Sequence, residues 1–281
     1  MSSGSIYQGN DGEAASRSAY RSTPVGGPSP VLPSGSIVPR KFLDDPHLVL
    51  MDRPGSPLAE RYRRLRLRLE QGTPEFPYRP QLTVMTSAVP GEGKSTTAMN
   101  LALAYAEDRT CRTLLIDADL RRPSVSGFIT PEPTLGLSEV LAAAAPLDHA
   151  LIEMSDSRLW VLPSGAPSTT PLELLQKKGL GKMIADVRSR FDRIVIDAPP
   201  TVPFTDAAVL AAHSDGALLV VRAGTTGAPL IRRARESLAG TNVLGVVLND
   251  VVFTVVDRYY YRYDDYEPGP YAYARKQENP A

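Results

Sequence analysis

The chain contains a single cysteine, Cys111, among its 281 residues, so it can form no internal disulfide and no cysteine-rich metal site. We therefore expect a reducing compartment, with Cys111 as a small residue of the core. An excess of one charge is also missing, because 31 Lys and Arg balance 31 Asp and Glu. This balance gives no reason to expect nucleic acid or an anionic membrane as the main partner.

Long apolar runs are absent as well. The N-terminal stretch MSSGSIYQGNDGEAASRSAY has no apolar core typical of a signal peptide. No uncharged apolar run approaches the roughly 18 residues that a membrane-spanning helix needs. We therefore expect a cytoplasmic protein, and any association with the membrane has to go through a partner.

Composition divides the chain into three parts. Residues 1–55 are rich in Ser, Gly and Pro up to about residue 40, which predicts a disordered arm followed by a connector at 41–54. Residues 56–256 carry the apolar runs of a folded domain, which opens with a predicted helix over 57–70 capped by Ser56. Residues 257–281 contain seven of the twelve tyrosines and little aliphatic content, which predicts a mobile, solvated tail.

Strands and helices alternate through the central part. The predicted strands are continuous apolar runs, as in strands buried on both faces of a parallel sheet, at Leu82–Thr86, Thr113–Ile116, Leu159–Leu162, Arg193–Ile196, Ala217–Val221 and Val243–Leu248. The predicted helices between them are Ser95–Ala106, Leu137–Ala144, Pro171–Ser189, Thr205–His213 and Leu230–Ala239. This alternation predicts an α/β fold with a doubly wound, mainly parallel sheet, whose ligands bind at the carboxyl ends of the strands.

The strongest motif is Ala88-Val-Pro-Gly-Glu-Gly-Lys-Ser-Thr96, which follows a predicted strand and opens a predicted helix. This is the context of a phosphate-binding loop, in which glycines turn backbone N–H groups toward a phosphate at a helix N-terminus. Lys94 would reach the β- and γ-phosphates of ATP, and Ser95 would bind Mg²⁺. The predicted nucleotide-binding residues are Val89, Pro90, Gly91, Glu92, Gly93, Lys94, Ser95 and Thr96.

Acidic residues end two other predicted strands. Asp197 closes the strand at 193–196, and Asp117 and Asp119 follow the strand at 113–116. If these strand ends meet in one cleft, one carboxylate can hold Mg²⁺ while another accepts a proton from an attacking hydroxyl. Arg121, together with Arg122, could neutralise phosphate charge that develops during transfer. An aspartate after a strand can also serve only as a helix cap.

The motifs SAVPGEGKST, LLIDADLRRP and RIVIDAPP together resemble the three nucleotide-site motifs of the bacterial tyrosine kinases, the CpsD/CapB-like kinases of capsule and exopolysaccharide synthesis. The resemblance spans residues 56–275 and includes LGLSEVL at 135–141 and LPSG at 162–165. Other P-loop relatives resemble this chain less. Partitioning and cell-positioning ATPases carry an additional lysine where this chain has Val89. Iron–sulfur carrier relatives have paired cysteines, which this chain lacks.

The resemblance assigns roles to single residues. It implies that Lys94 binds phosphate, that Ser95 and Asp197 hold Mg²⁺, with Asp117 a further candidate ligand, and that Asp117 or Asp119 is the base. Asn249 would contact the adenine, although a turn residue at a strand end is an equal alternative. The tail would supply the phosphate acceptors, which are Tyr259, Tyr260, Tyr261, Tyr263, Tyr266, Tyr271 and Tyr273. A tail used only for binding is the alternative.

The resemblance also implies an assembly and a cycle. Glu60, Arg63 and Arg66 match the Glu-x-x-Arg-x-x-Arg helix motif through which family members form rings, although a solvated charged helix face is the alternative. Phosphorylation of a neighbour's tail would then disperse the ring by charge repulsion. The implied partners are the protein itself, a membrane-spanning polysaccharide co-polymerase that activates it, and a phosphotyrosine phosphatase. An ATPase switch and a non-catalytic nucleotide-binding scaffold remain the competing hypotheses.

Overall fold

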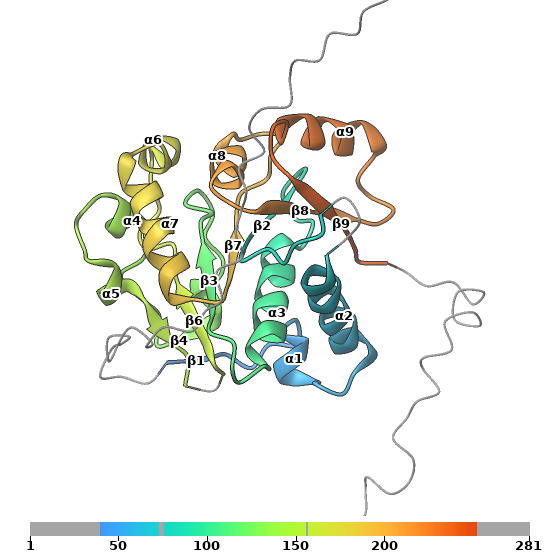
Figure 1. Ribbon diagram of the computed structural model, residues 1–281, viewed down its shortest axis with the longest axis horizontal. Coiled ribbons are helices and arrows are strands. Elements are labelled where there is room, and N and C mark those ends of the chain that lie inside the picture. Colours follow the sequence, from blue (N-terminus) through green and yellow to red (C-terminus); the bar gives the residue numbers. More distant parts are fainter. Residues whose placement is uncertain (1–39, 73–75, 156, 252–281) are drawn as a thin grey trace, which may run out of the picture. The chain divides into compact units, whose positions relative to one another are not determined.

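The computed structural model describes residues 40–72, 76–155 and 157–251. Its centre is a sheet in the order β5-β6-β3-β7-β2-β8-β9, parallel except for β5 (Figure 1). The bounds are β2 Leu82–Ser87, β3 Thr113–Asp117, β5 Ile152–Glu153, β6 Leu159–Leu162, β7 Arg193–Asp197, β8 Gly216–Arg222 and β9 Val243–Asn249. This architecture confirms the predicted α/β, doubly wound fold. None of the helices in the described ranges combines the length and apolarity needed to cross a membrane.

Helices cover both faces of the sheet (Figure 1). One face packs against α1 (Val49–Asp52), α2 (Pro57–Gln71) and α3 (Lys94–Ala106). The helices packed on the opposite side are α4 Leu137–Leu141, α5 Leu147–Ala150, α6 Pro171–Leu175, α7 Lys178–Arg190, α8 Asp206–Ala212 and α9 Ala228–Ser237. A second sheet pairs β1 (Lys41–Phe42) with β4 (Ile129–Thr130), which follows a short 3₁₀ helix at Ser126–Phe128.

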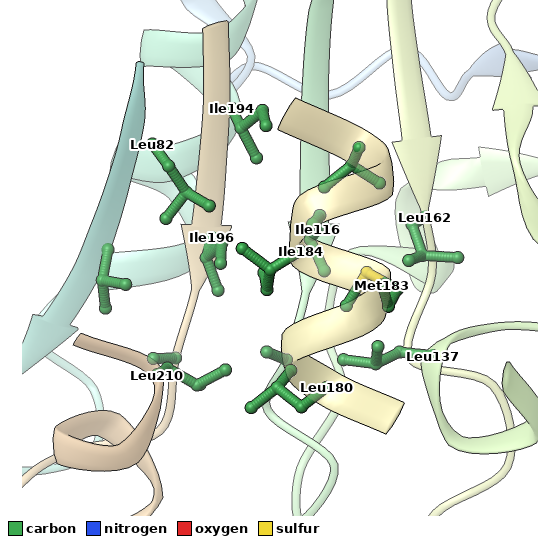
Figure 2. Close-up of a cluster of buried hydrophobic side chains, with 14 of the residues drawn as sticks. Leu82, Ile116, Leu137, Leu162, Leu180, Met183, Ile184, Ile194, Ile196 and Leu210 are labelled. Carbon is green, nitrogen blue, oxygen red and sulfur yellow. The ribbon is translucent and has the colours of Figure 1, made fainter. Parts of the chain in front are cut away.

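Successive residues of the central strands are buried on opposite faces, which explains their continuous apolar runs. In β7, Ile194 and Ile196 lie in the core under α7, whereas Val195 lies in the core under α3. Figure 2 shows the first of these cores, where Met183 and Ile184 of α7 lie over the strands. Rigid packing of this kind holds the strand ends in fixed positions.

The segment 41–54, which the sequence analysis treats as a connector, is instead part of the fold. It forms β1 and α1, and Phe42, Leu48 and Val49 are buried in the core beside α3. The signal is weak because each element is only a few residues long, and the polar segment 44–47 separates the two short apolar runs. The rest of the arm predicted at 1–55, namely residues 1–39, lies outside the described residues, as does the predicted tail.

The helix predicted over Pro171–Ser189 is two helices, α6 and α7, because Lys177 adopts an extended backbone. Leu175 and Leu180 are both fully buried in the same core. In one continuous helix, five residues would turn the chain by about 140°, so the two leucines would face different directions. The break therefore allows both leucines to reach the core. The helix predicted at 137–144 also ends earlier, at Leu141.

Candidate active site

The register of the sheet brings the predicted acidic residues together. β3, β7 and β2 are neighbours, and Asp117 of β3 is the register partner of Asp197 in β7. Asp197 is in turn paired with Met85 of β2, just before the phosphate-binding loop. Because parallel strands end at one edge of the sheet, the loop and both aspartates meet there.

The loop from Ala88 to Thr96 has the predicted geometry. Gly91 and Gly93 adopt positive φ angles of 83° and 86°, which side chains with a Cβ rarely allow. Helix α3 begins directly after Gly93, at Lys94, so its N-terminal end faces the loop. A helix N-terminus with this approach is suited to binding a phosphate.

Lys94 lies among the carboxylates. Its Nζ is 2.9 Å from Oδ2 of Asp119 and 3.6 Å from Oδ1 of Asp197, and it donates to Oγ of Ser95 at 3.2 Å. Burial lowers the pKa of Lys94, but the neighbouring carboxylates outweigh this effect and raise it. Lys94 is therefore protonated and able to bind a phosphate.

Asp197 is fully buried, and within the described part of the chain neither of its oxygens has a hydrogen-bond partner. Burial raises the pKa of its carboxyl group, against the opposing effects of Lys94 and Ser95. Buried carboxylate oxygens that accept no hydrogen bond, with only the long ion pair from Oδ1 to Lys94 and with further carboxylates nearby, suit a divalent cation. Asp197 and Ser95 therefore fit the predicted Mg²⁺ site.

No group of three acidic, histidine or cysteine side chains that could hold a metal occurs in the described ranges. Mg²⁺ bound with a nucleotide usually has one or two carboxylate ligands and completes its shell with water and phosphate oxygens.

Asp117 has a different environment from Asp197. Its Oδ1 accepts the N–H of Asp119 at 3.1 Å, and its Oδ2 accepts the N–H groups of Ser124 and Val125 at 3.1 and 3.0 Å. Burial and the neighbouring Asp197 raise the pKa of Asp117 to about 7, although these N–H groups oppose the rise. Asp117 thus fixes the loop that follows β3, and both of its oxygens are already engaged.

Asp119 is the carboxylate in direct contact with Lys94. Its Oδ1 accepts the backbone N–H of Arg122 at 3.0 Å, while its Oδ2 forms the ion pair with Lys94. The side chain is only 5 % exposed. One of its oxygens is therefore held by the backbone, and the other faces the loop lysine.

Arg121 pairs with Asp206, which belongs to the family resemblance at 205–207 but has no role assigned from the sequence. Its Nε lies 3.1 Å from Oδ2 of Asp206 at the start of α8, and its guanidinium group stacks at 4.2 Å on the ring of Phe204. Asp206 is buried, so this pair fixes the arginine at the edge of the site. An aspartate that opens a helix is typical of a cap, and nothing local in the sequence distinguishes this one.

Asn249, at the end of β9, contacts the phosphate-binding loop. Its Nδ2 donates to the backbone oxygen of Glu92 at 2.9 Å. The Glu92 side chain is buried, with acceptor contacts to Val89, Arg222 and Thr226. These contacts join the loop to the ends of β8 and β9, which the sequence pattern alone could not reveal.

The charged residues of α2 contact α3. The guanidinium of Arg63 forms a two-pronged ion pair with Glu107, with Nη2–Oε1 at 2.6 Å and Nε–Oε2 at 2.9 Å, and also lies 3.5 Å from Glu60. Nη1 of Arg66 donates to the backbone oxygen of Ala104 at 2.7 Å. The two arginines therefore attach α2 to the C-terminal end of α3. The predicted acceptor tyrosines, Tyr259 to Tyr273, lie outside the described residues.

Comparison with known proteins places this site in a family. A family model described as an AAA domain matches residues 83–229. The tyrosine-protein kinase YwqD of Bacillus subtilis (strain 168) is 36% identical over 206 residues, which is 72% of this chain and 85% of YwqD. The succinoglycan biosynthesis transport protein ExoP of Rhizobium meliloti (strain 1021) is 35% identical over 75% of this chain, although the match covers only 27% of ExoP.

A solved structure gives the same result. The crystal structure of the chimerical protein CapA2B2 has a TM-score of 0.69 and 29% identity, and the match covers 76% of this chain and 93% of that one. The phosphate-binding loop, the strand-end carboxylates and these similarities agree. The chain belongs to the family of the bacterial tyrosine-protein kinases.

Proposed function

We propose that the protein transfers the γ-phosphate of ATP to the tyrosine cluster at its own C-terminus, and that it does so between subunits. The observation that carries the proposal is the contact of Lys94 with Asp119 and Asp197 beside the phosphate-binding loop. The seven tyrosines of the tail follow the last strand of the same domain, next to acidic residues in a segment rich in charge.

Lys94 and the loop N–H groups would bind the β- and γ-phosphates, and Ser95 and Asp197 would hold Mg²⁺. When bound, the cation would offset the negative charge on the phosphates and the carboxylates. Asn249 lies against the loop on the β9 side, which agrees with a place near the nucleotide base. Arg121 would face the charge that develops on the transferred group, held in position by Asp206.

Asp119 is the better candidate for the base, because both oxygens of Asp117 are held by backbone N–H groups. When Lys94 turns to a phosphate, Oδ2 of Asp119 loses its partner and can accept the phenol proton. The tyrosine oxygen then bonds to the γ-phosphorus, the bond from that phosphorus to the oxygen bridging to the β-phosphate breaks, and ADP leaves.

The relatives suggest the setting. ExoP is a succinoglycan biosynthesis transport protein, so we place this kinase in the control of exopolysaccharide or capsule polymerisation and export. We propose that it acts in the cytoplasm, at the inner face of the membrane, bound to a membrane-spanning co-polymerase that activates it. A phosphotyrosine phosphatase would reset the tail.

Ring assembly through α2 is part of the proposal. In the single chain, Arg63 is already paired with Glu107, and Arg66 with a backbone oxygen of α3. Either arginine must therefore share or exchange its partner to contact a neighbouring subunit. Phosphate on the tails would then separate the subunits by charge repulsion.

The test is a mixing experiment with MgATP and the activator segment of the co-polymerase, read by anti-phosphotyrosine blotting and mass spectrometry. Full-length protein should gain phosphotyrosine in the tail, and Lys94→Met should not. A chain truncated after Val256 supplies the active site without acceptors, and full-length Lys94→Met supplies acceptors without activity. Phosphotyrosine on the Lys94→Met tail in the mixture is the expected result for transfer between subunits.

Asp119→Asn and Asp117→Asn distinguish the two candidate bases in the same assay. We expect Asp119→Asn to lose phosphate transfer to tyrosine while it still binds MgADP. ATP hydrolysis without phosphotyrosine, in the presence of a bound activator, would instead favour an ATPase switch and contradict the proposal.

A further inference from the structure

Glu92 lies within the phosphate-binding loop, but its side chain faces the end of β8 and the turn that follows it. The residue is 2 % exposed. Its Oε2 accepts the N–H of Val89 at 2.8 Å. Its Oε1 accepts the N–H of Arg222 at 3.2 Å and the hydroxyl of Thr226 at 2.5 Å. The carboxylate thus joins the phosphate-binding loop to the segment 222–226, which lies at least 130 residues beyond Glu92 in the sequence.

The backbone of the same residue is held from the β9 side. Asn249 donates to the Glu92 carbonyl at 2.9 Å, and a Cβ built on Gly93 would lie only 2.1 Å from the Asn249 amide nitrogen. The loop is therefore closely packed against the strand ends at this point. Only glycine at position 93 allows this approach.

The chemistry of these contacts requires a carboxylate. The three groups that donate to Glu92 are two backbone N–H groups and one hydroxyl, and they use both of its oxygens. An ionised carboxylate accepts hydrogen bonds on both oxygens and donates none. Glutamine at this position would present an NH₂ group to one of the donors and leave that donor without an acceptor.

We infer that Glu92 is a positioning residue that holds the phosphate-binding loop, through Val89, Arg222 and Thr226, in the shape that receives the phosphates of a nucleotide. The inference rests on the proposed nucleotide site. The loop N–H groups bind a phosphate only if they converge before it arrives, and a loop free to relax has to be ordered on each binding event. Glu92 therefore acts on nucleotide affinity without touching the nucleotide.

Thr226 offers a matched pair of variants outside the loop. Thr226→Val removes the hydroxyl that donates to Glu92 and keeps the shape of the side chain, whereas Thr226→Ser keeps the hydroxyl. Arg222→Ala is a second control, because Arg222 contacts Glu92 through its backbone N–H while its guanidinium group pairs with Asp250. Glu92→Gln tests the carboxylate itself.

The measurement is the dissociation constant of MgADP by titration calorimetry on the full-length chain, well below the melting temperature of each variant. We expect Glu92→Gln to raise it by about tenfold and Thr226→Val by about three- to tenfold, while Thr226→Ser and Arg222→Ala stay within about twofold of the wild type. In the kinase assay, the KM for ATP should rise and kcat at saturating ATP should change little.

Wild-type affinity in Thr226→Val and Glu92→Gln, with only a lower melting temperature, would overturn the inference and leave Glu92 a structural residue. If Glu92→Gln does not fold, Thr226→Val against Thr226→Ser decides. Lys94→Met tests the nucleotide site itself, independently of Glu92. If neither the wild type nor Lys94→Met bound MgADP, the proposed function would fail and the inference with it.

Discussion

Replacing Asp206 by asparagine removes the charge that holds Arg121 while keeping the size of the side chain. The closest nitrogen and oxygen of the pair are 3.1 Å apart, and the charge centres are about 4 Å apart. At that separation, two unit charges attract by about 1 kcal/mol in water and about 4 kcal/mol near a protein surface. The Asp206 side chain is 1% exposed but that of Arg121 is 30% exposed, so we expect an intermediate coupling of about 2 kcal/mol.

A double-mutant cycle measures this coupling. The free energy of unfolding in urea is determined for the wild type, Arg121→Gln, Asp206→Asn and the double variant, all without nucleotide. A coupling below about 0.5 kcal/mol would refute the view that Asp206 fixes Arg121. The same four proteins also report on function. Because Asp206 acts through Arg121, Asp206→Asn should lower kcat in the wild-type background and cause no further loss in Arg121→Gln.

Three further variants probe the core, the metal site and the attachment of α2. Ile184→Ala removes a buried side chain between α7 and the sheet, so the free energy of unfolding should fall by about 2–4 kcal/mol, and a loss under about 1 kcal/mol would contradict the packing described. Asp197→Asn removes a buried carboxylate whose pKa is raised, which means that its charged form is disfavoured in the fold. The melting temperature of the nucleotide-free protein should therefore not fall. The same variant should lose the stabilisation of about 2.7 kcal/mol that MgADP gives at a hundred times its dissociation constant, and retained stabilisation would argue against Asp197 as a metal ligand. Glu107→Gln breaks a partly exposed ion pair with Arg63, so the free energy of unfolding in urea should fall by at most about 1 kcal/mol. A larger fall would mean that the attachment of α2 depends on this pair.

The elements with a strong local signal were predicted from the sequence. The strands that carry the motifs are buried on both faces, so each is a continuous apolar run, and the turn after β2 requires glycine at two positions. The convergence of the loop with Asp117 and Asp197 also follows, because parallel strands place their carboxyl ends together. Periodicity and the chemistry of motifs are properties of neighbouring residues, which one sequence contains in full.

The remaining features depend on contacts between distant segments. Asp206 has the local pattern of a helix cap, and only the fold brings it to Arg121, 85 residues away in the sequence. Glu92 is a loop residue in the sequence, and only the fold places Thr226 against it. The break between α6 and α7 likewise depends on the core that Leu175 and Leu180 share. No local pattern contains these partners.

Helix α3 runs from the phosphate-binding loop to the contacts with α2. Its first residue is Lys94, its thirteen residues span about 20 Å, and at its other end Arg63 and Arg66 attach α2. Most of the helix is buried in the core against the sheet and α2. If nucleotide binding displaced this helix, α2 would move with it, and the factor by which nucleotide changed the affinity of a partner for α2 would equal the factor by which that partner changed the affinity for nucleotide.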